Sequence, residues 1–453
     1  MSRRVRITTG LLILVWVCAV LATYSWRTEP VAAQTASTSC LGGAVALPAP
    51  GGANVFLTFL EHFSPEDAAT ADAYYQATDP FNRRLTLRDW LETNEFLSAG
   101  APFGPGVPGD IGDGSIQTDA LAVYLNGADL GFGRRMYLRR NADGALASYV
   151  ENYGFDHDND ISTPPRFEGV ADLDILDSAE TRTVNDLIAT VCMEYKAPDD
   201  DPTGPKRVTF YTYAANGSRV GINGLNLDGR GDKAQPGVCN VCHGGAPKPP
   251  VNGVYPDKGN TDAYFLPWDV ATFKFDTRPG SPFTREAQES QFKNFNEAVL
   301  RHHEQQLEFD PIAGINRRKA PVELIRGWYG GATMPNDTFN EDFVPLGWRP
   351  SDERGVPAGS GRIYREVIGP YCRACHIQRE RSLDFATYKG FITFKAAIQD
   401  LVYTVPFSGG GGDDIGTRPG DDRAVMPLAL RTYNNFWNSN APELLCKFLA
   451  RTP

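Results

Sequence analysis

Two short stretches, Cys239–His243 (CNVCH) and Cys372–His376 (CRACH), carry the same C-x-x-C-H pattern within a chain of 453 residues. In this pattern two thiols bond covalently to the vinyl groups of one haem, and the imidazole that follows ligates the iron. Because the chain has only eight Cys and six His, chance does not account for two such matches. The sequence therefore predicts two covalently attached haem c groups. A zinc half-site or a dithiol redox pair is the alternative interpretation.

The haem-binding residues that this pattern predicts are Cys239, Cys242 and His243 in the first motif and Cys372, Cys375 and His376 in the second. His243 and His376 are the expected iron ligands, because the imidazole follows directly after the second thiol.

The second motif follows a helical pattern. Tyr364, Val367, Ile368 and Tyr371 have the i, i+3, i+4, i+7 spacing of an amphipathic helix, which would run over 361–371 directly into Cys372. A last helix is expected from Asn440 through Leu449, with Pro442 at a favourable early position. Between them Met426 precedes Pro427, fifty residues beyond His376. That is a suitable place for a thioether ligand on the opposite face of the haem, and a Met that only fills the core is the alternative.

Residues 360–453 resemble a class I cytochrome c domain in their order of helix, CRACH, long loop, Met-Pro and terminal helix. The resemblance implies that His376 and Met426 are the axial ligands of the second haem. The stretch 226–437 is also similar to a family of exported dihaem proteins with cytochrome c domains, which implies haem binding and electron transfer but no substrate. This similarity is carried by NLDGRGDKAQPGVCNVCHGG (226–245), FLPWDV (265–270), LIRGWYGG (324–331), FVPLGW (343–348), CRACH and MPLALRTYNNFW (426–437).

The first motif has no helical pattern before it. Pro236 and Gly237 precede Cys239, and two glycines follow His243, so we expect a loop whose backbone is closely packed. A helix is expected over 284–303, with an apolar face that ends at two histidines. The sixth ligand of the first haem stays open among His302, His303, Met334 and an open coordination position. For the two histidines, an exposed position near a helix C-terminus is the alternative.

The N-terminus predicts export. Three arginines precede an apolar run over 10–22, and small residues at 31–33 offer a cleavage site, as in a secretory signal peptide. Residues 1–33 are therefore expected to be removed on export, which would leave the chain periplasmic or secreted. An uncleaved membrane anchor is the alternative. Beyond the haem motifs and the signal, Cys40, Cys192 and Cys446 remain, so one disulfide is expected with its pairing open.

The remaining pattern predicts the fold class. Asn216-Gly217 between two β-rich runs indicates a hairpin, and a weaker one brackets 141–144. The acidic, Pro-containing stretch 197–206 is the expected domain boundary. We therefore expect an α+β chain, in which a mixed N-terminal region is followed by mainly α-helical, cytochrome-c-like haem domains. The expected parts are the signal peptide 1–33, the mixed region 34–205, a first haem-c region 206–345 and a second haem domain 346–453.

Charge limits the partners. The formal net charge is −11, and removing 1–33 takes away four Arg and one Glu, which leaves −14. This balance argues against nucleic acid or an anionic membrane as partner and is compatible with basic redox proteins. The function expected is electron transfer between exported redox partners. The alternative is an enzyme, a dihaem peroxidase or haem oxygenase with an open distal site at the first haem; a third interpretation makes the N-terminal region a docking module.

Overall fold

The structure is a computed structural model, and it describes most of the chain beyond residue 67. All described residues belong to one unit, Cys40–Pro453. The described residues are 68–101, 116–141, 143–154, 171–221, 227, 233–306, 309–310, 315–316, 319–377, 384–395, 398 and 428–450.

A six-stranded antiparallel sheet forms the centre of this unit, in the order β5-β4-β3-β2-β1-β6. Both predicted hairpin turns are confirmed: β2 pairs with β3 across 141–144, and β5 turns back at Asn216-Gly217, where Gly217 has a φ of 80°. The strands are β1 (Ala120–Asn126), β2 (Gly133–Arg140), β3 (Leu146–Tyr153), β4 (Leu187–Lys196), β5 (Arg207–Ala214) and the short β6 (Phe273–Lys274).

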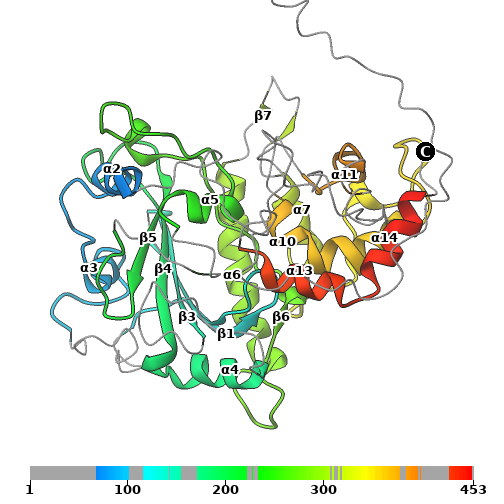
Figure 1. Cartoon of the computed structure of the whole chain (residues 1–453), viewed down its shortest axis with the longest axis horizontal. Coiled ribbons are helices and arrows are strands. Elements are labelled where there is room, and N and C mark those ends of the chain that lie inside the picture. Colours follow the sequence, from blue (N-terminus) through cyan, green and yellow to red (C-terminus); the bar gives the residue numbers. More distant parts are fainter. Residues whose placement is uncertain are drawn as a thin grey trace, which may run out of the picture. The chain divides into compact units, whose positions relative to one another are not determined.

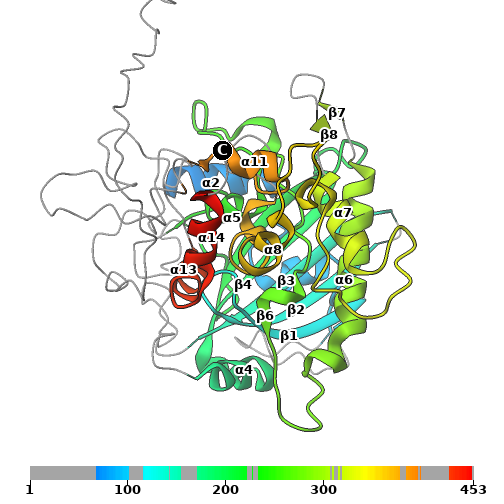
Figure 2. The ribbon, with the colours of Figure 1, turned by 90° about the vertical axis from the view of Figure 1, so that its right-hand side faces the viewer.

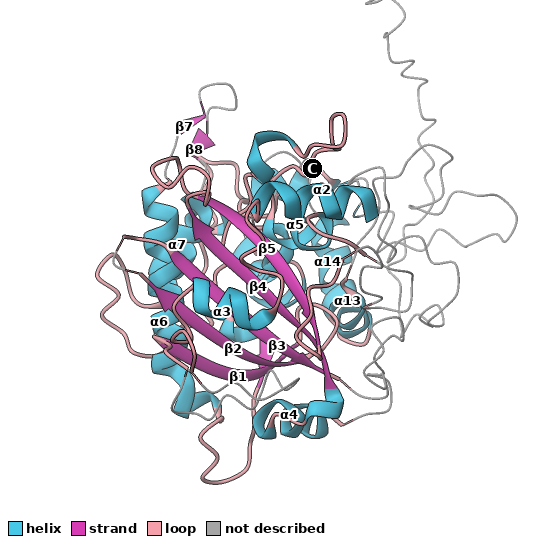
Figure 3. Ribbon diagram, turned by 90° about the vertical axis from the view of Figure 1, so that its left-hand side faces the viewer, coloured by secondary structure: helices cyan, strands magenta, loops and turns pink. Residues whose placement is uncertain are grey.

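The two faces of the sheet are covered by different helices (Figures 1 and 3). On β5, Tyr211 and Tyr213 belong to the cluster with α2 (Ala68–Thr78) and α3 (Leu87–Thr93), whereas Val208 and Phe210 belong to the larger cluster with α6 (Arg285–Gln305). Because alternate side chains of a strand point to opposite faces, both faces must be covered.

Helix α6 confirms the helix predicted over 284–303. Thr284 caps it by accepting a hydrogen bond from the Ala287 N–H, and Phe292, Phe295 and Val299 are buried along one face. The predicted last helix is confirmed as α14 (Ala441–Ala450). The other helices of at least four residues with α-helical bonding are α4 (Asp172–Thr181), α5 (Gly237–His243), α7 (Lys319–Trp328), α8 (Ser360–Ile363), α10 (Arg373–His376), α11 (Tyr388–Ile392) and α13 (Leu430–Trp437).

The helix predicted before the second motif is present, but it is not uniform. It consists of α8, a π-helical turn over Tyr364–Ile368 and α9 (Gly369–Tyr371). The C-terminal helices pack on it: α14 contacts α8 and the π-helical turn, and α13 contacts α9 (Figure 2). Among the helices that the structure describes, none has the length and apolar character needed to cross a membrane.

The expected fold class is wrong, because the described chain is not a mixed region followed by mainly helical cytochrome domains. One antiparallel sheet takes β5 and β6 from beyond residue 205, and α6 packs on its strand β1. The stretch 197–206, which the sequence indicated as a domain boundary, connects the paired strands β4 and β5. The physical reason is that β5 is buried on both faces, so it needs neighbours within a covered sheet rather than a linker before it.

Candidate functional site

The two C-x-x-C-H motifs lie on neighbouring helices. Cys239, Cys242 and His243 are on α5, and Cys375 and His376 are on α10, directly after Cys372. Residues of α5 and α10 have Cα atoms within 8 Å of each other (Figure 1). The structure thus brings together the six predicted attachment and ligand residues from two distant parts of the sequence.

The first motif is helical rather than a loop. Helix α5 contains all of CNVCH, which corrects the expected loop conformation. The expected close backbone packing is confirmed at Gly245, where a Cβ atom would lie 2.1 Å from the carbonyl oxygen of Thr261 and where φ is 81°. Only glycine suits such a position, so the chain can turn sharply after His243 and place the segment from Thr261 onward against the motif.

His243 is held by the backbone of Tyr264. Its Nδ1 lies 3.0 Å from the Tyr264 carbonyl oxygen, and the Tyr264 N–H donates back to the His243 carbonyl at 3.1 Å. A proton on Nδ1 that is used in this way leaves Nε2 with its lone pair, the form in which an imidazole binds iron. Burial is the main cause that lowers the pKa of His243 to about 4; the hydrogen bond to Tyr264 opposes this shift and the nearby Arg134 charge adds to it, so the ring is neutral at pH 7.

Asn240, the first variable residue of CNVCH, anchors α5. Its side chain is buried, and its Nδ2 donates to the carbonyl oxygen of Gly244 at 2.5 Å and to Oγ1 of Thr261 at 3.1 Å. The amide therefore closes the end of α5 onto the segment that also holds His243.

The second motif is one helical turn. The N–H groups of Cys375 and His376 donate to the Cys372 carbonyl at 3.3 Å and 2.9 Å, which places the thiols and the imidazole along one side of the turn. The His376 ring stacks on Phe385, with ring centroids 4.4 Å apart and planes at 14°. Burial raises the pKa of the Cys372 thiol to about 12.

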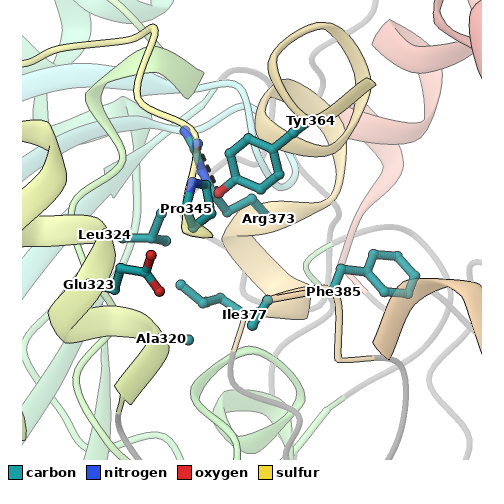
Figure 4. Close-up of a pocket in the computed structure, with 9 residues that line it drawn as sticks. Ala320, Glu323, Leu324, Pro345, Tyr364, Arg373, Ile377 and Phe385 are labelled. Atoms are coloured by element: carbon teal, nitrogen blue, oxygen red, sulfur yellow. Dashed lines mark hydrogen bonds between the residues drawn. The ribbon is translucent and has the colours of Figure 1, made fainter. Parts of the chain in front are cut away.

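Arg373, the first variable residue of CRACH, is buried in a fixed environment. Its Nε and one terminal nitrogen donate to the two carboxylate oxygens of Asp269, both at 2.7 Å. The other terminal nitrogen donates to the Tyr364 hydroxyl at 3.3 Å (Figure 4). The side chains of Arg373 and Asp269 are only 6% and 5% exposed. The guanidinium carbon also lies 5.2 Å from the ring centroid of Trp328.

A small pocket adjoins α10 on the side of Arg373 and Ile377 rather than on the side of the thiols. Tyr364 and Phe385 line it, and from α7 the carboxylate of Glu323 faces it (Figure 4). Glu323 is already used, because its Oε1 accepts a hydrogen bond from the Leu346 N–H at 2.5 Å.

These residues fit covalent haem. Each motif places two thiols and an imidazole on one helical turn, none of the four cysteines is in a disulfide, and all four are partly exposed. At His243 the hydrogen bond to Tyr264 additionally fixes the tautomer that binds iron. No group of three His, Cys, Asp or Glu side chains that could hold one metal ion occurs in the described part of the chain.

Comparisons with known proteins found no match. This holds for the protein-family models, for the curated proteins and for the solved structures. The site is therefore interpreted from its own residues.

The other predicted iron ligands lie in different environments or outside the described residues. Met426 lies outside the described residues. His302 and His303 are 2% and 0% exposed, so their alternative placement as exposed residues is wrong. Nε2 of His303 lies 2.8 Å from the Phe265 carbonyl oxygen, and the Phe265 N–H lies 3.5 Å from Nε2 of His302, so both rings bind the backbone beside the first motif. Met334 is buried in the large core cluster.

Asp269 and Tyr264 were missed as site residues. Both lie in or next to the stretch FLPWDV, where an acidic residue stands among apolar ones. Because a buried carboxylate must be paired, that pattern indicates a cationic partner, but it does not say that the partner is Arg373.

The remaining cysteines reduce the disulfide choices. Cys446 is disulfide-bonded, whereas Cys192 on β4 is a free, fully buried thiol. Two of the three pairings left open by the sequence are thereby excluded, and Cys40 lies outside the described residues.

Proposed function

We propose that this chain is an exported dihaem c-type cytochrome that carries electrons between redox partner proteins. The observation that supports this proposal best is the pair of C-x-x-C-H turns on the adjacent helices α5 and α10. The orientation of His243 by the Tyr264 carbonyl supports it further.

In this proposal the residues of the chain attach the two haems, orient the iron ligands and shield them from water. Cys239 with Cys242, and Cys372 with Cys375, would hold the two haems through thioether bonds, and His243 and His376 would ligate their irons. Each haem supplies, when bound, an iron that takes up and releases one electron. Phe385 packs flat against the His376 ring and keeps water from that side. The contact between α5 and α10 places the two attachment points side by side, which suits transfer of an electron between them.

The proposed location and partners follow from the sequence. Export by the signal at 1–33 delivers the chain to the periplasm or beyond, where thiols can be joined to haem. The charge of −14 that remains after removal of 1–33 favours basic redox proteins as partners.

Haem content tests the proposal. A pyridine haemochrome assay, combined with the intact mass of the purified protein, should give two covalent haems per chain. Zinc without haem in the wild-type protein would overturn the proposal. The same mass spectrum should show a mature N-terminus near Gln34, and an intact Met1 would instead indicate an anchored protein.

Ligand access distinguishes the carrier from the alternative enzyme. If both irons have two axial ligands, the EPR spectrum of the oxidised protein should show two low-spin centres that do not respond to cyanide. A substantial high-spin component that shifts on cyanide addition would favour a dihaem peroxidase or haem oxygenase, because such an enzyme needs an open coordination position.

A further inference from the structure

One segment contacts both haem motifs. We name the residues Thr261–Asp269 the bridging segment. At one end, Thr261 accepts from Asn240 and the Tyr264 carbonyl binds His243, so this end is fixed to the first motif. At the other end, Asp269 binds Arg373 of the second motif through two hydrogen bonds of 2.7 Å.

Helix α6 holds the bridging segment between these two ends. Asn296, which is fully buried, accepts from the Trp268 N–H at 2.9 Å and donates to the Trp268 carbonyl at 3.0 Å. About two helical turns further along, His303 binds the Phe265 carbonyl at 2.8 Å. The position of Asp269 is therefore set by the neighbouring backbone before Arg373 binds, so that the carboxylate is preorganised for its partner.

The two ends differ in charge. The first motif is held by a neutral amide and a backbone carbonyl, whereas the second is held by a buried ion pair. Charges so far from water interact strongly with their surroundings, because little solvent screens them. Within the pair the two charges cancel, so removal of either partner would leave one net charge beside the motif.

We propose that Asp269 is a positioning residue that holds Arg373, and through it α10, on the bridging segment, and that the charge balance of this pair sets the reduction potential of the second haem. The proposal rests on the proposed function. A net positive charge beside an iron favours its reduced state and raises the potential, and a net negative charge lowers it, since reduction decreases the positive charge of the centre.

The test is spectroelectrochemistry of both haems in Asp269→Asn, Arg373→Met and the double variant. Asp269→Asn leaves Arg373 unpaired and should raise the midpoint potential of the second haem. Arg373→Met leaves Asp269 unpaired and should lower it. The double variant is neutral, and its midpoint should return close to the wild-type value. The first haem should shift less in every variant, because the substituted ion pair is bonded to α10 and not to α5.

Midpoint potentials that shift in opposite directions in the two single variants distinguish this electrostatic role from a merely structural one. Loosening of α10 alone would admit water in both single variants and move both midpoints in the same direction. Shifts of one sign, or no shift, in proteins that still carry two haems would overturn the proposal. If neither single variant folds, the double variant decides: a midpoint near the wild-type value supports the proposal, and a large shift overturns it.

A second buried ion pair provides the control. Glu151 of β3 binds Arg182 at the end of α4 at 2.9 Å, with side chains that are 0% and 11% exposed. Glu151→Gln should lower thermal stability without moving either midpoint. Haem counting on the wild-type protein distinguishes failure of the proposed function from failure of the role of Asp269. Absence of haem contradicts the proposed function. Two haems, with midpoint potentials that do not shift in the variants, contradict only the role of Asp269.

Discussion

The two haem motifs share a pattern but are held in different ways. In CNVCH, the first variable residue is Asn240, a neutral amide that closes α5 onto Gly244 and Thr261. In CRACH, the same position is Arg373, which is paired with Asp269 in the protein interior. The first motif ends in two glycines on which the bridging segment packs, whereas the second follows a helical run that begins at Ser360.

This difference indicates a division of roles. Neutral, backbone-based anchoring fixes the geometry of the first motif with little effect on its electrostatics. The ion pair fixes the second motif and also sets the charge around it, so it is the more sensitive of the two to single substitutions. In both motifs the first variable residue is a buried anchor, although the C-x-x-C-H pattern places no requirement on it.

The largest expected effect is loss of one haem at a time. Cys239→Ala with Cys242→Ala should remove the first haem and leave one per chain, and Cys372→Ala with Cys375→Ala should remove only the second, because each thiol pair serves one porphyrin. The pyridine haemochrome assay and intact mass measure this directly. Loss of both haems from either variant would mean that the two sites assemble together, and the comparison between them would then fail.

The next effect concerns the second haem alone. If Met426 is its distal ligand, Met426→Ala should abolish the weak charge-transfer band of thioether-bound ferric iron and lower the midpoint potential of that haem, since the ligand that favours ferrous iron is lost. Spectroelectrochemistry should show the first haem unchanged. If Met426 only fills the core, the substitution should instead cost roughly 2–5 kcal/mol of stability, with an unaltered spectrum.

Local patterns in the sequence predicted local structure well. The helical spacing of Tyr364, Val367 and Ile368 predicted the run before CRACH, and Asn216-Gly217 predicted the turn after β5. These features depend on neighbours within a few residues, so periodicity and turn chemistry are sufficient to identify them. The π-helical bonding within the run was not predictable from that spacing.

Contacts between distant residues were not predictable in the same way. Asp269 and Arg373 are 104 residues apart, and β6 joins the sheet from beyond the first motif. The pattern of FLPWDV indicates a buried acid but not its partner, because the pairing is decided by how the bridging segment and α10 meet. The expected fold class was wrong for the same reason: a strand such as β6 is placed by its long-range partner β1.

A smaller effect is expected from crowding the first motif. Gly245→Ala should destabilise the protein by about 3 kcal/mol, because the new Cβ would meet the Thr261 carbonyl oxygen and the residue must keep a positive φ. Gly253→Ala is the matched control: Gly253 also has a positive φ, but nothing lies within 4 Å of the added Cβ. Its cost should be about 1 kcal/mol. Thermal unfolding of the two variants measures the difference, and equal losses would show that the bridging segment does not pack tightly on α5.

The smallest effect tests the neutral anchor. Asn240→Ala removes the donor to the Gly244 carbonyl and Thr261, and should cost about 1–2 kcal/mol of stability, since two buried acceptors lose a partner. Thr261→Val removes only one of the acceptors and should cost less, because Asn240 keeps its bond to Gly244. Neither variant changes a charge, so the midpoint potentials of both haems should stay close to the wild-type values. A shift at the first haem as large as that of Asp269→Asn at the second would mean that geometry, rather than charge, sets both potentials.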